Sequence, residues 1–193
     1  MLNRLRASAE RLLDYVDASR LPLRPNAVTL MSLAISALVP VASASSLPML
    51  AALLVLASAV LDAVDGHIAR RRGLQSAFGA FLDSTTDRVC DAIHTYALAL
   101  AGIIEADVAY ALAISEQLVS YARARAEGLG ADLSGIGLME RGERVAAKVL
   151  ALAAASWSRA VARTIVLATL LLSLLTVVQR VVAARRLLRG GRP

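Results

Sequence analysis

Cysteine and aromatic side chains are scarce in this chain of 193 residues. A single cysteine, Cys90, excludes an internal disulfide, a cysteine-ligated zinc cluster and an iron–sulfur site. Aromatic residues make up only 4% of the chain and offer few surfaces for stacking bases, which argues against a nucleic-acid partner despite the net charge of +6. With 11 glycines and 5 prolines, the chain is neither collagen-like nor of low complexity.

Apolar residues dominate the composition instead. They make up 58% of the chain against 19% charged residues, and the mean hydropathy is +0.62, which indicates an integral membrane protein. A transmembrane helix needs roughly 20 apolar residues. We predict an all-α bundle of six transmembrane helices, at residues 26–46, 48–68, 78–104, 108–126, 145–157 with flanking residues, and 164–184. The fifth helix is the least apolar, because Arg141, Glu143, Arg144 and Lys148 lie in or near its first turns.

Residues 1–24 precede this bundle and mix leucines with arginines and acidic residues. This pattern predicts a cytoplasmic juxtamembrane amphipathic helix at the membrane interface, and it does not resemble a signal peptide. The transmembrane domain is expected over residues 25–193. Its connecting arginines fall mainly on one side, which the positive-inside rule makes cytoplasmic. We therefore expect a multi-pass protein of the cell membrane with both termini in the cytoplasm, and an anionic lipid or phosphorylated substrate as its partner.

Carboxylates inside apolar helices are costly in a membrane and indicate functional sites. Asp62 and Asp65 lie three residues apart near the end of the second predicted helix, and Asp83 and Asp87 lie four apart near the start of the third. Each pair therefore shares a helix face, and a hairpin through residues 71–77 brings the pairs together. Four converging carboxylates repel one another unless divalent cations lie between them, and oxygen ligands favour Mg²⁺, Mn²⁺ or Ca²⁺.

Charge alone leaves a second interpretation open, in which these aspartates form ion pairs near the headgroups with Arg70, Arg72 and Arg88. The spacing favours the metal site. Residues 61–87 read LDAVDGHIARRRGLQSAFGAFLDSTTD, with the specified positions Asp62, Asp65, Gly66, Ala69, Arg70, Gly79, Asp83 and Asp87. This segment resembles the signature of the CDP-alcohol phosphotransferase family of integral membrane enzymes, and the six-helix plan is also similar to that family.

The resemblance implies that a CDP-linked lipid gives its phosphatidyl-type group to a hydroxyl, with release of CMP. It implies two Mg²⁺ or Mn²⁺ ions held by Asp62, Asp65, Asp83 and Asp87, with Asp87 also acting as general base, and a homodimer. The implied contacts of the CDP-linked lipid are Asn26, Thr29, Gly66, Ala69, Arg70, Ser76 and Gly79. Asn26 is also a preferred helix-starting residue, and glycines also permit close helix packing, so these alternatives stay open.

Two segments near the second cytoplasmic loop indicate the acceptor. Residues 120–127 read SYARARAE and residues 139–144 read MERGER. Arg123, Arg141 and Arg144 are the candidates for an anion pocket that binds the phosphate of a phosphorylated polyol. The segments resemble those of the phosphatidylinositol-phosphate and archaetidylinositol-phosphate synthases within the family, which implies inositol 1-phosphate. Glycerol 3-phosphate is the alternative acceptor, because relatives that use it share the first segment.

A function of another class is a divalent metal-ion transporter, in which the same four aspartates form a permeation site. Such a pathway needs ionisable or polar groups along the whole membrane depth, and the outer halves of the predicted helices offer no ionisable residues. The sequence therefore favours the enzyme.

Overall fold

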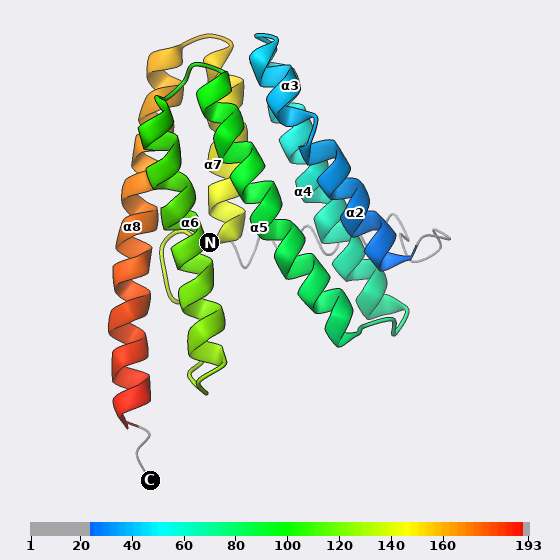
Figure 1. Cartoon of the computed structure of the whole chain (residues 1–193), viewed down its shortest axis with the longest axis vertical. Coiled ribbons are helices and arrows are strands. Elements are labelled where there is room, and N and C mark those ends of the chain that lie inside the picture. The colour runs from blue at the N-terminus through cyan, green and yellow to red at the C-terminus, as the bar shows by residue number, and fades with distance from the viewer. Residues whose placement is uncertain (1–23, 191–193) are drawn as a thin grey trace.

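The computed structural model describes residues 24–190, and every regular element in that range is an α-helix (Figure 1). The helices are α2 (Pro25–Ser36), α3 (Val39–Ala44), α4 (Pro48–Arg71), α5 (Ala77–Leu100), α6 (Ala106–Glu127), α7 (Arg141–Ala155) and α8 (Arg159–Gly190). The all-α prediction is confirmed for this range. The amphipathic helix predicted for residues 1–24 lies outside the described residues, apart from Arg24 at its end.

Proline residues begin and divide the first helices. Pro25 and Pro48 lie at the start of α2 and α4, where a helix has no use for the N–H that proline lacks. The single helix predicted for residues 26–46 is instead divided into α2 and α3. Pro40 explains the division, because it cannot donate to the carbonyl of Ser36 and its ring crowds that carbonyl.

Three stretches of the described chain are long and apolar enough to cross a membrane: Pro25–Ala44, Pro48–Arg71 and Arg159–Arg189. They contain α2 with α3, α4, and nearly all of α8. The last helix is longer than the prediction of 164–184, since α8 has 32 residues. At 1.5 Å per residue it extends about 48 Å, which exceeds the roughly 30 Å of a hydrocarbon core.

The faces of α8 are arranged as in a helix that borders lipid. Its outward side chains over residues 165–178 are apolar, and Leu171, Val178 and, just beyond, Val181 are each more than half exposed. Its inward side chains include polar ones, and Ser173 and Thr176 are fully buried. A soluble helix has the opposite pattern, whereas polar side chains of membrane helices face the interior of the bundle.

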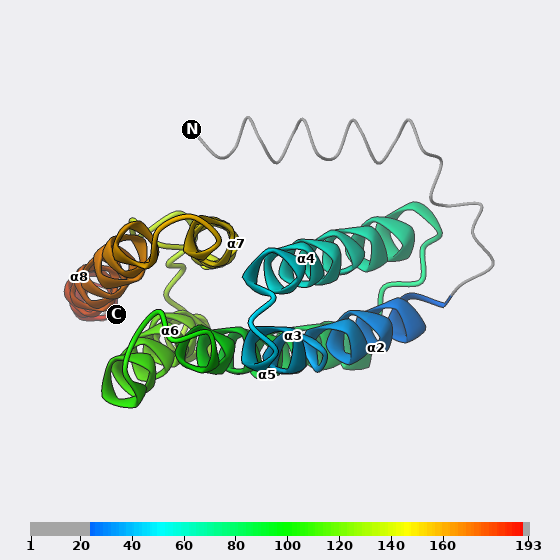
Figure 2. The ribbon, with the colours of Figure 1, turned by 90° about the horizontal axis from the view of Figure 1, so that it is seen from above.

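The main apolar core fills one end of the bundle. It is built largely from alanine, valine and leucine on six helices, and its members include Val39, Ala51, Val55, Ala97, Leu98, Leu112, Ala151, Leu152 and Val166. The small side chains let these helices approach closely. Seen from above, α4 and α7 lie in one row, and α2, α5 and α6 lie in the other (Figure 2). At the opposite end of the bundle, the end of α4 and the starts of α5 and α7 carry the charged side chains described next.

Candidate active site

Three aspartates on the α4–α5 hairpin form a compact acidic cluster. Asp62 comes from the last turns of α4, and Asp83 and Asp87 come from the first turns of α5. Each of the three offers a carboxylate oxygen, and these oxygens all lie within 4.8 Å of one another. Convergent carboxylate oxygens at this separation suit a hard divalent cation such as Mg²⁺ or Mn²⁺.

Asp65, the fourth predicted ligand, lies beside this cluster but is held by another helix. Its side chain is buried, and Oδ2 accepts a hydrogen bond of 2.5 Å from the hydroxyl of Thr29 on α2. Thr29 also lies among the residues predicted to face the nucleotide. The contact therefore joins one predicted metal ligand to one predicted nucleotide residue.

Arg141 at the start of α7 bridges two members of the acidic cluster. Its Nη1 atom lies 2.5 Å from Oδ2 of Asp62, and its Nη2 atom lies 2.7 Å from Oδ1 of Asp87. Arg88 is farther away, with 3.9 Å between its Nη1 atom and Oδ2 of Asp87. The sequence suggested Arg70, Arg72 and Arg88 as possible ion-pair partners of the aspartates; the structure adds Arg141, whose contacts with Asp62 and Asp87 are shorter than that of Arg88 with Asp87.

Small and polar residues gather near the start of α5. Ser76 precedes α5, and its hydroxyl oxygen accepts a hydrogen bond of 3.0 Å from the backbone N–H of Gly79. A Cβ atom on Gly79 would lie 3.0 Å from this oxygen and 3.4 Å from Oδ1 of Asn26, so Gly79 leaves room between these two polar side chains. On α4, a Cβ on Gly66 would lie 3.2 Å from Nη1 of Arg70. Ala69 is half-buried on the same helix.

The predicted anion-binding arginines occupy different environments. Arg123 is half-exposed and donates to Glu127 at 2.8 Å and to the hydroxyl of Ser134 at 3.3 Å. The hydroxyl and the backbone N–H of Ser134 in turn donate to Asp132, and these hydrogen bonds hold the pKa of Asp132 below its usual value. Arg144 is only 1% exposed. Its guanidinium donates to the Met139 carbonyl at 3.0 Å, and longer contacts of 3.4 Å reach Asp91 and Ser120.

Next to Arg141 and Arg144 lies a buried group of charged residues, in which the pairing of Lys148 with Glu116 was not predicted from the sequence. Lys148 on α7 donates to Oε2 of Glu116 on α6 at 2.9 Å and to the backbone carbonyl of Asp91 on α5 at 3.0 Å. Thr95 donates to the same Glu116 oxygen at 2.8 Å. With Arg144, the group holds two carboxylates and two cations, all buried. Glu116 and Lys148 were visible as ionisable residues in predicted membrane helices, but 32 positions separate them and nothing in the sequence indicates that they pair.

Arg180 on α8 also escaped the sequence analysis, although it lies inside the sixth predicted helix. It is 3% exposed and donates to the carbonyls of Ile136 at 2.8 Å and Val119 at 2.5 Å. An arginine within an apolar membrane helix is the signal that would have identified it.

Comparison with known proteins places this chain in a family. The model of the CDP-alcohol phosphatidyltransferase family matches residues 23–188. The chain belongs to this family of membrane phosphotransferases, as the hairpin motif indicated.

Curated relatives agree with this assignment. An archaetidylinositol phosphate synthase from Pyrococcus horikoshii is 35% identical over 193 residues, covering 99% of this chain and 100% of the relative. A phosphatidylinositol phosphate synthase from Streptomyces avermitilis is 41% identical over 138 residues, covering 65% of this chain and 57% of the relative.

The fold is similar to crystal structures of the Mycobacterium tuberculosis phosphatidylinositol phosphate synthase. The structure with CDP-DAG bound has a TM-score of 0.77 at 24% identity and covers 94% of each chain. The structure in complex with manganese and citrate has a TM-score of 0.78 at 24% identity, covering 93% of this chain and 88% of the other. At 24% identity, both comparisons show that the chains share a fold.

Proposed function

We propose that this enzyme transfers a phosphatidyl-type group, carried on diacylglycerol or archaeol, from a CDP-linked lipid to inositol 1-phosphate and releases CMP. The observation that carries the proposal is the contact of Arg141 with both Asp62 and Asp87. It places a phosphate-binding type of side chain directly beside a carboxylate cluster suited to divalent cations. A reaction between a diphosphate donor and a phosphorylated acceptor needs both. The names of the curated relatives support inositol phosphate as the acceptor.

In this proposal the donor binds along α4 and the start of α5. Two Mg²⁺ or Mn²⁺ ions held by the four aspartates would neutralise charge on the diphosphate, and this is the chemistry that the metal supplies. Thr29 orients Asp65 through its hydrogen bond. The wall for the nucleotide is formed by Asn26, Thr29, Gly66, Ala69, Arg70, Ser76 and Gly79. The Ser76 oxygen accepts from Gly79, which leaves its hydroxyl proton for a phosphate oxygen.

The acceptor binds on the α7 side of the cluster. Arg141 and the half-exposed Arg123 hold its phosphate, and the buried Arg144 supports them through Met139. Because Arg141 contacts Asp87, a phosphate bound there brings the acceptor hydroxyl near this carboxylate. Asp87 removes the hydroxyl proton, and the oxygen attacks the phosphorus that bears the lipid alcohol. A new P–O bond forms, the bond to the CMP oxygen breaks, and CMP leaves with the electron pair.

The proposed topology completes six membrane helices within a domain of residues 25–193. The joined α2 and α3 form the first span, and α4, α5, α6, α7 and α8 form the others. The active site and both termini face the cytoplasm, with residues 1–24 as a helix at the membrane surface, and the protein forms a homodimer. Arginines concentrated at the site end of the bundle support this orientation under the positive-inside rule.

Two other functions lead to different expectations. Glycerol 3-phosphate also carries a phosphate that Arg123 and Arg141 would bind, so it is the alternative acceptor. A divalent metal-ion transporter needs a polar route beyond the acidic cluster. The apolar core that closes the opposite end of the bundle disfavours this route in the described part of the chain.

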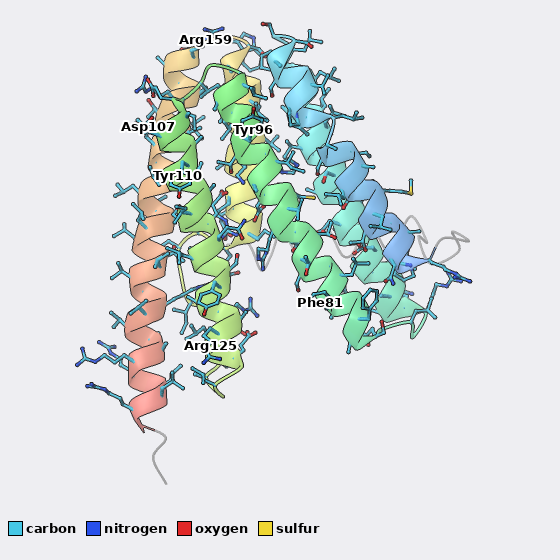
Figure 3. The ribbon with its side chains drawn as sticks, viewed as in Figure 1. Phe81, Tyr96, Asp107, Tyr110, Arg125 and Arg159 are labelled. Carbon is cyan, nitrogen blue, oxygen red and sulfur yellow. The ribbon has the colours of Figure 1, made fainter. Side chains whose placement is uncertain are left out.

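The test is CMP release by purified protein from CDP-archaeol or CDP-diacylglycerol with Mg²⁺. We expect turnover with inositol 1-phosphate, loss of turnover on metal removal, and loss of turnover in Asp87→Asn. Asp107→Asn is the matched control, because Asp107 lies at the opposite end of the bundle from Phe81 and the start of α5 (Figure 3). A preference for glycerol 3-phosphate would establish the alternative acceptor. No CMP release with either acceptor would refute the transfer reaction, and turnover by Asp87→Asn would exclude Asp87 as the base.

A further inference from the structure

The connection between α6 and α7, residues 128–140, is held by the hydroxyl of Thr176 on α8. Thr176 is fully buried, and its Oγ1 atom accepts hydrogen bonds from the backbone N–H groups of Leu138 at 3.1 Å and Met139 at 3.0 Å. The same hydroxyl donates to the Leu172 carbonyl at 2.8 Å. One side chain thus satisfies two backbone donors of a segment more than 35 residues away in sequence. In Figure 1 this connection lies between α6 and α8.

Gly137 makes the close approach to Thr176 possible. Its φ angle is +126°, a conformation that favours glycine, and a Cβ atom there would collide with the methyl group of Thr176. One helical turn farther along α8, Arg180 donates to the Ile136 carbonyl. Backbone groups of residues 136, 138 and 139 are therefore all bound by α8.

This contact lies two residues before Arg141, which binds the acidic cluster. The Met139 N–H is bound by Thr176, and the Met139 carbonyl accepts from Arg144. Both polar groups of this residue are thereby fixed by side chains of two other helical segments. Glu140 follows as the N-cap of α7, and Arg141 is the first residue of that helix and contacts Asp87. The position of residues 138–139 therefore sets where α7 begins and where the guanidinium of Arg141 lies.

We propose that Thr176 is a positioning residue for the transfer reaction. Its hydroxyl binds the backbone N–H groups of Leu138 and Met139 while its methyl group lies against Gly137, and these contacts hold Arg141 where it binds the acceptor phosphate beside Asp87. This inference rests on the proposed function. It also gives α8, which adds no carboxylate to the acidic cluster among the described residues, a part in acceptor binding. The donor side of the site is built on α2, α4 and α5, so a disturbed Thr176 affects the acceptor selectively.

The experiment compares Thr176→Val, which removes the hydroxyl and keeps the shape, with Thr176→Ser, which keeps the hydroxyl. The matched control is Thr169→Val on the same helix, because Thr169 is also buried and its hydroxyl donates to Ile165 within α8. We expect Thr176→Val to raise the KM for inositol 1-phosphate about tenfold, with the KM for the CDP-linked lipid within about twofold of wild type. Thr176→Ser and Thr169→Val are expected to stay near wild type.

Gly137→Ala disturbs the same contact from the loop side, because the added methyl group collides with Thr176. It is also expected to raise the acceptor KM. Hydrogen exchange of the Leu138 and Met139 amides, measured on each protein, is expected to accelerate in Thr176→Val and not in Thr169→Val. An unchanged acceptor KM in Thr176→Val, an equal rise of both KM values, or a Thr176→Ser variant as impaired as Thr176→Val overturns the positioning role while the proposed function stands. A wild-type enzyme that releases no CMP with inositol 1-phosphate overturns the proposed function and this role together.

Discussion

Replacing Lys148 with methionine removes the cation from the centre of the buried charged group. The Lys148 ammonium lies 2.9 Å from Oε2 of Glu116 and 3.0 Å from the Asp91 carbonyl, and the side chains of Lys148 and Glu116 are each 1% exposed. Methionine has a similar length and no charge. In Lys148→Met, the Glu116 carboxylate keeps the hydrogen bond from Thr95 and a distant contact of 3.9 Å with Arg144.

The expected loss of stability follows from this burial. Removing one partner of a buried ion pair costs about 3–5 kcal/mol, because the remaining charge stays away from water. Lys148→Met is therefore expected to lower the free energy of unfolding by that amount. Glu116→Gln is expected to be destabilising as well, since it leaves the ammonium without its carboxylate. In the double variant neither charge remains, so its cost is expected to be at least about 2 kcal/mol smaller than the sum of the two single costs.

The assay is unfolding of the purified protein in mixed micelles of increasing denaturing-detergent content, followed by the helical circular dichroism signal. The matched control is the cycle of Arg123→Met and Glu127→Gln, because this pair has the same 2.8–2.9 Å geometry but side chains that are 43% and 44% exposed. Coupling in the exposed pair is expected to stay below about 1 kcal/mol. Single costs at Lys148 and Glu116 that add within about 0.5 kcal/mol would refute the reasoning.

Three further outcomes test the acidic site and its donor side. Asp83→Asn is expected to weaken Mn²⁺ binding about tenfold or more in calorimetric titration, and unchanged affinity would exclude Asp83 from the ligand set. Thr29→Val is expected to lower kcat about tenfold because Asp65 loses its hydrogen bond, whereas Thr29→Ser is expected to keep activity. Equal losses of kcat in both variants would contradict a role for the hydroxyl. Gly79→Ala brings a Cβ to 3.0 Å from the Ser76 oxygen. The variant is therefore expected to raise the KM for the CDP-linked lipid but not the KM for the acceptor. A rise in the acceptor KM alone would argue against a donor site at Gly79.

Local patterns in the sequence were enough to predict the α4–α5 hairpin. Spacings of three and four residues place Asp62 and Asp65 on one helix face, and Asp83 and Asp87 on another, because a helix turns once every 3.6 residues. The short connection brings the end of α4 and the start of α5 together, although along most of their length these helices pack against α2 and α3 rather than against each other. The cluster of Asp62, Asp83 and Asp87 is the direct consequence.

Contacts between helices that are far apart in the sequence could not be predicted from the sequence alone. Arg141 was predicted as a phosphate-binding residue, but its contact with Asp62 spans 79 positions and depends on how α7 packs against α4. The attachment of Asp65 to Thr29 likewise depends on the placement of α2, 36 positions away. The periodicity of apolar or charged residues shows which side chains share one face of a helix, but it does not show which other helix packs against that face.

The sequence by itself determined the all-helical class, the membrane environment and the acidic hairpin, because composition and helical spacing act over neighbouring residues. The tertiary structure alone decided which charges neutralise one another, as in the pairing of Lys148 with Glu116, and how Thr176 of α8 holds the segment before Arg141. The physical reason is that the energies of buried charges and of unpaired backbone groups depend on distances of about 3 Å across helices, and only the packed bundle sets those distances.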